Sequence, residues 1–297
     1  MSLRTKFERM IAIGAIIGLA GCGGPAAALS GKTDTPPTLM AAADRFVTNG
    51  SIRIRYREIG QGRPVVLLHG YTDRLEMWAG AADSLAADRR VIVPDVRGFG
   101  GSDKPADAAA YGRAMAEDVV ALLDALGIDR VDLVGYSMGA LISADLSVRH
   151  PDRIRSAVLV AGPFFPDSAA LATTVAPHLA ALERGEGLLS FFRWIVPTLP
   201  DSVIAPMAVQ FHTENDHDAL VASMRAIGQL VHDSTALAGV AVPAVAVVGR
   251  TDPLLAQSRW LGGVWKGIKV VELAEADHAV VFAAPEVVAE ARAIARP

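Results

Sequence analysis

The sequence predicts an α/β fold in which a mostly parallel, doubly wound sheet of about eight strands carries helices on both faces. Short apolar runs without alternation, typical of parallel strands buried on both sides, occur at 65–68, 91–93, 131–134, 157–160 and 244–248, with a weaker run at 268–273. Helical stretches separate several of these runs, and strand–helix–strand repetition indicates a parallel sheet. Asn49-Gly50 lies between the β-prone runs 46–48 and 52–57 and predicts an antiparallel hairpin.

Patterns inside this framework predict individual elements. Apolar residues from Met115 to Leu126 recur at helical spacing, and Gly127 follows as a C-cap. In the hairpin, Arg53, Arg55 and Arg57 share one face of a strand, which favours a solvated strand face over an anion site.

The strand–helix rhythm stops between residues 163 and 238, where helical patterns and no strand are predicted. We therefore expect the sheet domain to comprise residues 45–162 and 239–297, with 163–238 as a helical cap insertion. The aromatic residues near and within this insertion, which fit either a substrate pocket or plain packing, are Phe164, Phe165, Phe191, Phe192 and Trp194.

Composition excludes several classes of protein. The 297 residues are 52% hydrophobic and 20% charged, which is typical of a globular chain rather than a disordered one. The net charge of −4 provides no overall basic field for nucleic acid. A single cysteine excludes an internal disulfide framework and a cysteine-rich metal site. No cofactor or metal is expected, and the oligomeric state is left open.

The first residues predict export. Arg4, Lys6 and Arg9 precede a short apolar core, as in a signal peptide, here assigned to residues 1–21. Residues 19–22, Leu-Ala-Gly-Cys, resemble the bacterial lipobox, which implies lipidation at Cys22. The resemblance also implies a membrane anchor at the cell envelope, on the outer membrane or the periplasmic face, followed by a flexible tether over 22–44. The alternative is a plain secretory signal cut near residues 26–28.

The pentapeptide Gly135-Tyr136-Ser137-Met138-Gly139 follows a buried strand and opens a helical stretch. In this context the glycines permit a tight turn that presents the Ser137 hydroxyl above the sheet edge, as a nucleophile requires. The alternative is an ordinary strand-to-helix turn with a capping serine.

A serine nucleophile needs a base, and the base needs an acid. Among the seven histidines, His278 is best placed because it follows the last predicted strand. Asp252 directly follows the strand 244–248 and is the preferred acid, with Asp167 in reserve. Two backbone donors are expected to bind the oxyanion: the N–H of Met138 and, in the loop after 65–68, the N–H of Tyr71. His69 is expected to brace this loop.

These motifs, in this order, resemble the α/β-hydrolase fold over nearly the whole of 46–297; they are residues 69–71 (His-Gly-Tyr), 94–102 (Pro-Asp-Val-Arg-Gly-Phe-Gly-Gly-Ser), 135–139, 249–252 (Gly-Arg-Thr-Asp) and 277–278 (Asp-His). The resemblance implies that 163–238 covers the site as a cap and that Arg97 and Ser102 are structural. Dehalogenases and epoxide hydrolases of this fold use an aspartate where this chain has Ser137, so neither activity is expected.

The expected function is a serine esterase that cleaves an ester-type bond of a small, largely apolar substrate through an acyl-enzyme. The same triad serves C–C bond and lactone hydrolases, and the dipeptide Ser137-Met138 does not distinguish them. A ligand-binding protein that keeps the fold without turnover is the alternative from another class.

Overall fold

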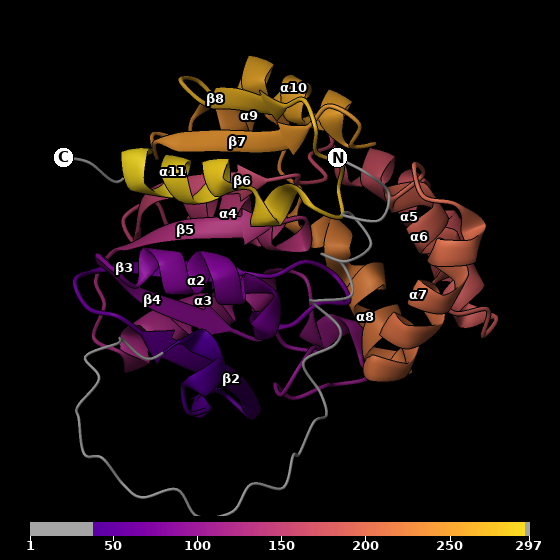
Figure 1. Cartoon of the computed structure of the whole chain (residues 1–297), viewed down its shortest axis with the longest axis horizontal. Helices are drawn as coiled ribbons and strands as arrows, with labels where there is room; N and C mark the ends of the chain where they lie inside the picture. The colour runs from indigo at the N-terminus through magenta and orange to yellow at the C-terminus, as the bar shows by residue number, and fades with distance from the viewer. Residues whose placement is uncertain (1–37, 295–297) are drawn as a thin grey trace, which may run out of the picture.

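The computed structural model describes residues 38–294 (Figure 1). The predicted signal peptide, Cys22 and the first part of the tether lie outside this range. The strands are β1 (Arg45–Asn49), β2 (Ile52–Ile59), β3 (Arg63–Leu68), β4 (Arg89–Pro94), β5 (Val131–Tyr136), β6 (Ile154–Val160), β7 (Ala244–Gly249) and β8 (Lys269–Leu273). The α-helices are α2 (Ala79–Leu85), α3 (Arg113–Ala125), α4 (Met138–Arg149), α5 (Ser168–Glu183), α6 (Leu189–Ile195), α7 (Asp201–Glu214), α8 (His217–Ala226), α9 (Ser234–Ala238), α10 (Leu255–Val264) and α11 (Pro285–Ile294).

All eight strands form one sheet in the order β1-β2-β4-β3-β5-β6-β7-β8. The β1–β2 hairpin and its pairing with β4 are antiparallel, and every pair from β4 to β8 is parallel. The predicted fold class is therefore confirmed. Several strands begin before the apolar run that predicted them, as β3 does at Arg63, because hydrogen bonding to β4 extends to its first residues.

Each face of the sheet has its own apolar core, because successive side chains of a strand point to opposite sides. Val66 and Leu68 of β3 join a core with helices α3, α4 and α10, whereas Val65 and Leu67 join a second core with α2 and α11. The sheet is thus covered on both faces, as parallel strands require. Within 38–294, no helix combines the length and apolar character that a membrane crossing needs.

Between β6 and β7 the described chain is helical, with no strand. Helices α5 to α8 gather beside the sheet, at the edge toward which β7 points (Figure 1). The short helix α9, at the end of the same insertion, contacts α10. The insertion therefore lies beyond the carboxyl ends of the parallel strands, where the chain segments carrying the predicted catalytic residues emerge.

The prediction that residues 22–44 form a flexible tether is wrong for the last part of that range. Leu39, in a short 3-10 helix (Leu39–Ala41), is fully buried in the core beside α2. Its backbone N–H donates to the Asp83 carboxylate at 2.7 Å. An apolar side chain and a backbone donor therefore attach this segment to the sheet domain before β1 begins.

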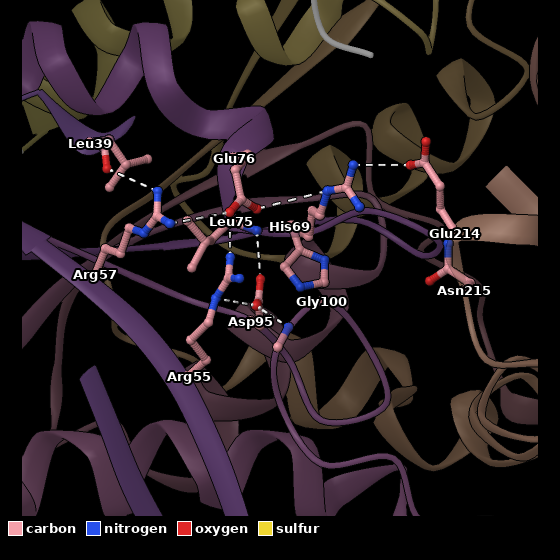
Figure 2. Close-up of polar contacts among 12 residues, drawn as sticks. Leu39, Arg55, Arg57, His69, Leu75, Glu76, Asp95, Gly100, Glu214 and Asn215 are labelled. Carbon is pink, nitrogen blue, oxygen red and sulfur yellow. Dashed lines mark hydrogen bonds and ion pairs between the residues drawn. The ribbon is translucent and has the colours of Figure 1, made fainter. Parts of the chain in front are cut away.

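The prediction of a solvated arginine face holds for Arg53 but is wrong for its two neighbours. The Arg53 side chain is 58% exposed, whereas those of Arg55 and Arg57 are only 13% and 14% exposed. Carboxylates from three other segments cover them: Arg55 pairs with Glu76 and Asp95 (Figure 2), and Arg57 pairs with Asp44. Nothing in the spacing of these acidic residues indicates that they meet.

Candidate active site

The Ser137 side chain stands on a strained turn between β5 and α4. Ser137 has a φ of +52°, which is uncommon for a residue with a side chain and marks a position held by its surroundings. The Ser137 N–H donates to the Val160 carbonyl at 2.8 Å, and the Ser137 carbonyl accepts from Ala140 at 3.0 Å. These bonds fix the turn so that the hydroxyl projects at the carboxyl edge of the sheet.

Two glycines of the pentapeptide allow helix α4 to approach the sheet. A Cβ on Gly139 would lie 2.2 Å from the Leu68 carbonyl oxygen of β3. A Cβ on Gly135 would lie 2.2 Å from the Gly139 carbonyl oxygen. No side chain fits at these distances, so the close contact of α4 with β3 needs glycine at 139 and its close contact with β5 needs glycine at 135.

The structure brings the three predicted polar side chains together. His278 Nε2 lies 3.2 Å from Ser137 Oγ, and His278 Nδ1 lies 3.0 Å from Asp252 Oδ2. The other oxygen of Asp252 accepts the Leu254 N–H at 2.8 Å, which orients the carboxylate. Because Nδ1 faces a carboxylate, the ring proton belongs on Nδ1, and Nε2 is left to accept a proton from Ser137. All three side chains are buried.

Two further acidic residues near the site, Asp167 and Asp277, bind other groups. Asp167, the reserve acid, caps helix α5 by accepting the Ala170 N–H at 2.8 Å. Asp277 turns toward the cap, where its carboxylate accepts a hydrogen bond from the Thr198 hydroxyl at 3.2 Å.

Tyr136 supports His278 through its hydroxyl group, which donates to the His278 carbonyl at 2.8 Å. Burial raises the pKa of Tyr136 well above 10.0, so this phenol keeps its proton. Tyr136 carries no signal in the sequence beyond its place in the pentapeptide.

The segment 69–74, here called the oxyanion loop, lies against the nucleophile. A Cβ on Gly70 would lie 3.3 Å from the Ser137 Cβ and 2.9 Å from the Tyr136 ring, so the loop backbone passes close to the serine. Met138 is the first residue of α4, and its N–H belongs to the first turn, which has no intrahelical acceptor. The two predicted donors, Tyr71 and Met138, therefore sit on neighbouring segments beside Ser137.

The His69 side chain fixes the oxyanion loop through two hydrogen bonds. Its Nε2 accepts the Val96 N–H at 2.9 Å, so the ring proton is on Nδ1, which donates to the Gly70 carbonyl at 2.8 Å. The Gly70 carbonyl and the Tyr71 N–H belong to one planar peptide, and fixing the first fixes the direction of the second. Burial lowers the pKa of His69 to about 4, so the ring is neutral at physiological pH. The predicted bracing role agrees with these contacts.

A pocket opens from Ser137 into the space beneath the cap. It contains about 480 Å³ of empty space, including solvent at its mouth. Among its lining residues only Ser137, Tyr71 and Trp194 carry a side-chain O–H or N–H group; the lining is Tyr71, Ser137, Met138, Pro163, Leu171, Val175, Phe191, Trp194, Ile195, Met224, Ile227 and Leu254. Such a lining favours an uncharged, apolar group. Within the described chain, no three or more His, Cys, Asp or Glu side chains are arranged to hold a metal ion.

Comparisons with known proteins agree with this arrangement. Residues 63–193 match the family model described as alpha/beta hydrolase fold. The chain is 36% identical over 159 residues to a 2-hydroxymuconate semialdehyde hydrolase from Pseudomonas sp. (strain CF600), which covers 51% of this chain and 56% of that protein. The chain thus spans about half the length of the curated relatives it matches.

Solved structures are similar over a longer stretch. An enol-lactonase from Burkholderia xenovorans LB400 matches with a TM-score of 0.70 and 23% identity, over 84% of this chain and 99% of that one. An enzyme that degrades N-acyl homoserine lactones matches with a TM-score of 0.66 and 25% identity, over the same shares. The sheet order, the strained serine turn and these matches together show that the described part of the chain has the α/β-hydrolase fold.

Proposed function

We propose that the protein is a serine hydrolase that cleaves an ester-type bond of a small, largely apolar substrate. The observation that carries the proposal is the position of His278, 3.0 Å from Asp252 and 3.2 Å from Oγ of Ser137, which lines an apolar pocket. A nucleophile, a base and an orienting acid in this geometry are what acyl transfer requires.

The chemistry proceeds in two steps. As Ser137 Oγ attacks the substrate carbonyl carbon, His278 Nε2 takes the hydroxyl proton, and the negative oxygen faces the N–H groups of Tyr71 and Met138. The carbon–oxygen bond to the alcohol then breaks, and His278 returns the proton to the leaving oxygen. Water repeats the sequence on the acyl-enzyme and releases the acid. Asp252 stabilises the imidazolium ion in both steps.

Labelling of the nucleophile tests this proposal. A fluorophosphonate probe is expected to label wild-type protein and the Ser84→Ala variant, and to fail with Ser137→Ala. Ser84 is a matched control because its hydroxyl binds the carbonyl of its own helix. Wild-type protein that is folded but neither labelled nor active on p-nitrophenyl esters would favour a ligand-binding protein without turnover.

The second candidate function is hydrolysis of a lactone or of a C–C bond. The relatives support it, since one is a 2-hydroxymuconate semialdehyde hydrolase and two structural matches are an enol-lactonase and an N-acyl homoserine lactone degrading enzyme. Against an ionised substrate, none of the pocket-lining residues is charged. Comparing kcat/KM for p-nitrophenyl esters of increasing chain length, aliphatic lactones and a carboxylate-bearing dienoate distinguishes the three bond types.

We further propose that the protein is exported, lipidated at Cys22 and anchored at the cell envelope. The basic start, the short apolar core and the Leu-Ala-Gly-Cys motif support this. Mass spectrometry of the mature N-terminus tests the proposal: a diacylated or triacylated Cys22 is expected. An unmodified Cys22, or a chain that begins near residue 28, would contradict it.

A further inference from the structure

We propose that Asn215 of the cap is a positioning residue, which holds the oxyanion loop in the turn that places the Tyr71 N–H beside Ser137. The inference rests on the proposed function, because it concerns the second oxyanion donor of that reaction. Asn215 lies in the junction between α7 and α8, far from residues 69–74 in the sequence.

The oxyanion loop contains a turn that its sequence disfavours. The Asp73 N–H donates to the Gly70 carbonyl at 3.3 Å, which closes a four-residue turn over residues 70–73. Thr72, its third residue, has a φ of +70°, whereas Tyr71 is not among the residues with positive φ. This combination defines a type II turn, in which the third position favours glycine. A β-branched residue is strained there, and such strain persists only when neighbouring groups hold it.

Asn215 provides such a restraint. Its side-chain amide donates to the Thr72 carbonyl at 2.9 Å and to the Phe211 carbonyl, in the last turn of α7, at 2.9 Å. Both amide hydrogens are used, so the side chain has one orientation and joins helix α7 to the strained residue. Thr72 itself is buried, which shields this hydrogen bond from water.

Without this bond the turn has an alternative. Threonine favours the type I turn, in which the third residue has negative φ, and the change between the two types rotates the Tyr71–Thr72 peptide by about half a turn. After this rotation the Tyr71 carbonyl would point where the Thr72 N–H points now, and the reverse. The rotated peptide directly follows the Gly70–Tyr71 peptide, whose N–H donates to the oxyanion. Preorganised donors lose most of their effect when they are displaced from the reacting oxygen.

Two more contacts join the same loop to the same corner of the cap. The Tyr71 hydroxyl donates to the Leu220 carbonyl of α8 at 2.9 Å, and Arg74 pairs with Glu214 at 3.0 Å. Figure 2 shows Glu214 and Asn215 next to each other, with a dashed line that joins Glu214 to a guanidinium group, that of Arg74. The Arg74–Glu214 pair is about one-third exposed, so we expect it to contribute less than the amide. The α7–α8 corner therefore determines the shape of the oxyanion loop.

Steady-state kinetics of the full chain on a p-nitrophenyl ester test the inference. We expect Asn215→Ala to lower kcat about tenfold or more, less than outright loss of a donor, with KM within about twofold of wild type. Affinity for a trifluoromethyl ketone, whose adduct with Ser137 carries an oxyanion, should fall by the same factor as kcat/KM. Asn49→Ala is the matched control, because Asn49, the only other asparagine, binds Asp118 instead.

A second background separates positioning from simple destabilisation. Glycine adopts the Thr72 conformation without strain, so Thr72→Gly should remove most of the dependence on Asn215. The loss caused by Asn215→Ala is therefore expected to shrink at least several-fold in the Thr72→Gly background. If Asn215→Ala does not fold, Asn215→Asp keeps the shape, lacks the amide hydrogens and should show the same loss.

The outcomes are distinct. Three results would overturn the positioning role: kinetics of Asn215→Ala equal to those of Asn49→Ala, a rise in KM alone, or an equal loss of kcat in both Thr72 backgrounds. If Ser137 is still labelled by the fluorophosphonate probe, the proposed function stands in each of these cases. Wild-type protein without labelling or turnover would overturn both.

Discussion

At the scale of single residues, the proposed mechanism depends on which tautomer His278 adopts, and the contact with Asp252 favours the tautomer protonated on Nδ1. Asn at position 252 could present its N–H₂ group to Nδ1 and favour the wrong tautomer. We expect Asp252→Asn to lower kcat about 10³–10⁴-fold with little change in KM. Asp167→Asn, which keeps a residue able to cap α5, should remain near wild type. Steady-state ester hydrolysis measures both, and an equally inactive Asp167→Asn would show that the acid has been misassigned.

His69 predicts a pH dependence of stability. Its pKa is about 4 in the folded chain because burial disfavours the charged ring, against 6.5 in an unfolded chain. Between these values the unfolded state binds the proton and the folded state does not, so the free energy of unfolding falls as pH decreases from about 6.5 to about 4. The single-site contribution is roughly 3 kcal/mol.

Urea unfolding at a series of pH values measures this slope. His69→Gln should lose stability at pH 7 but show a flatter profile through the same window, since it has no ring to protonate. An identical slope in the variant would mean that other groups cause the acid sensitivity.

At the scale of elements, the contact between α4 and β3 fixes the distance from the nucleophile to the oxyanion loop. Gly139→Ala places a Cβ 2.2 Å from the Leu68 carbonyl, so helix α4 must move away. We expect a loss of about 1–3 kcal/mol in the free energy of unfolding and a lower kcat, because Ser137 directly precedes this helix. In contrast, Gly263→Ala on α10 meets no atom within 4 Å and should be neutral or stabilising. Thermal melting and ester turnover of the two variants provide the comparison.

The elements also show how far sequence patterns reach. Buried runs predicted the strands, and the strand-to-helix pentapeptide predicted the Ser137 turn, because both follow from local chemistry. The proximity of His278 and Asp252 to Ser137 could be predicted because each follows a predicted strand, and parallel strands end at a common edge. The arginine cluster and the Asn215–Thr72 bond could not be predicted, since each joins segments whose separation in the sequence carries no periodic signal.

At the scale of the whole molecule, the proposed lipidation of Cys22 predicts where in the cell the protein is found. If Cys22 carries acyl chains, each buried CH₂ contributes about 0.8 kcal/mol to membrane affinity, and more than one chain gives stable anchoring. We expect Cys22→Ser to move the protein from the membrane fraction to the soluble periplasmic fraction, with Ser137 labelling unchanged. Cell fractionation followed by probe labelling checks this. Retention of the variant in membranes would point to another means of attachment.

Helices α5 and α6 of the cap, and the α7–α8 corner, have different consequences for protein engineering. We expect substitutions at the pocket-lining positions of α5 and α6 to alter which substrates fit, while the α7–α8 corner stays intact. Grafting a whole cap from another hydrolase would replace Asn215 and Glu214 together with the pocket wall, and a chimera could then bind its new substrate yet turn it over slowly. Retaining residues 214–220 of the host, or introducing glycine at position 72, is the corresponding design rule.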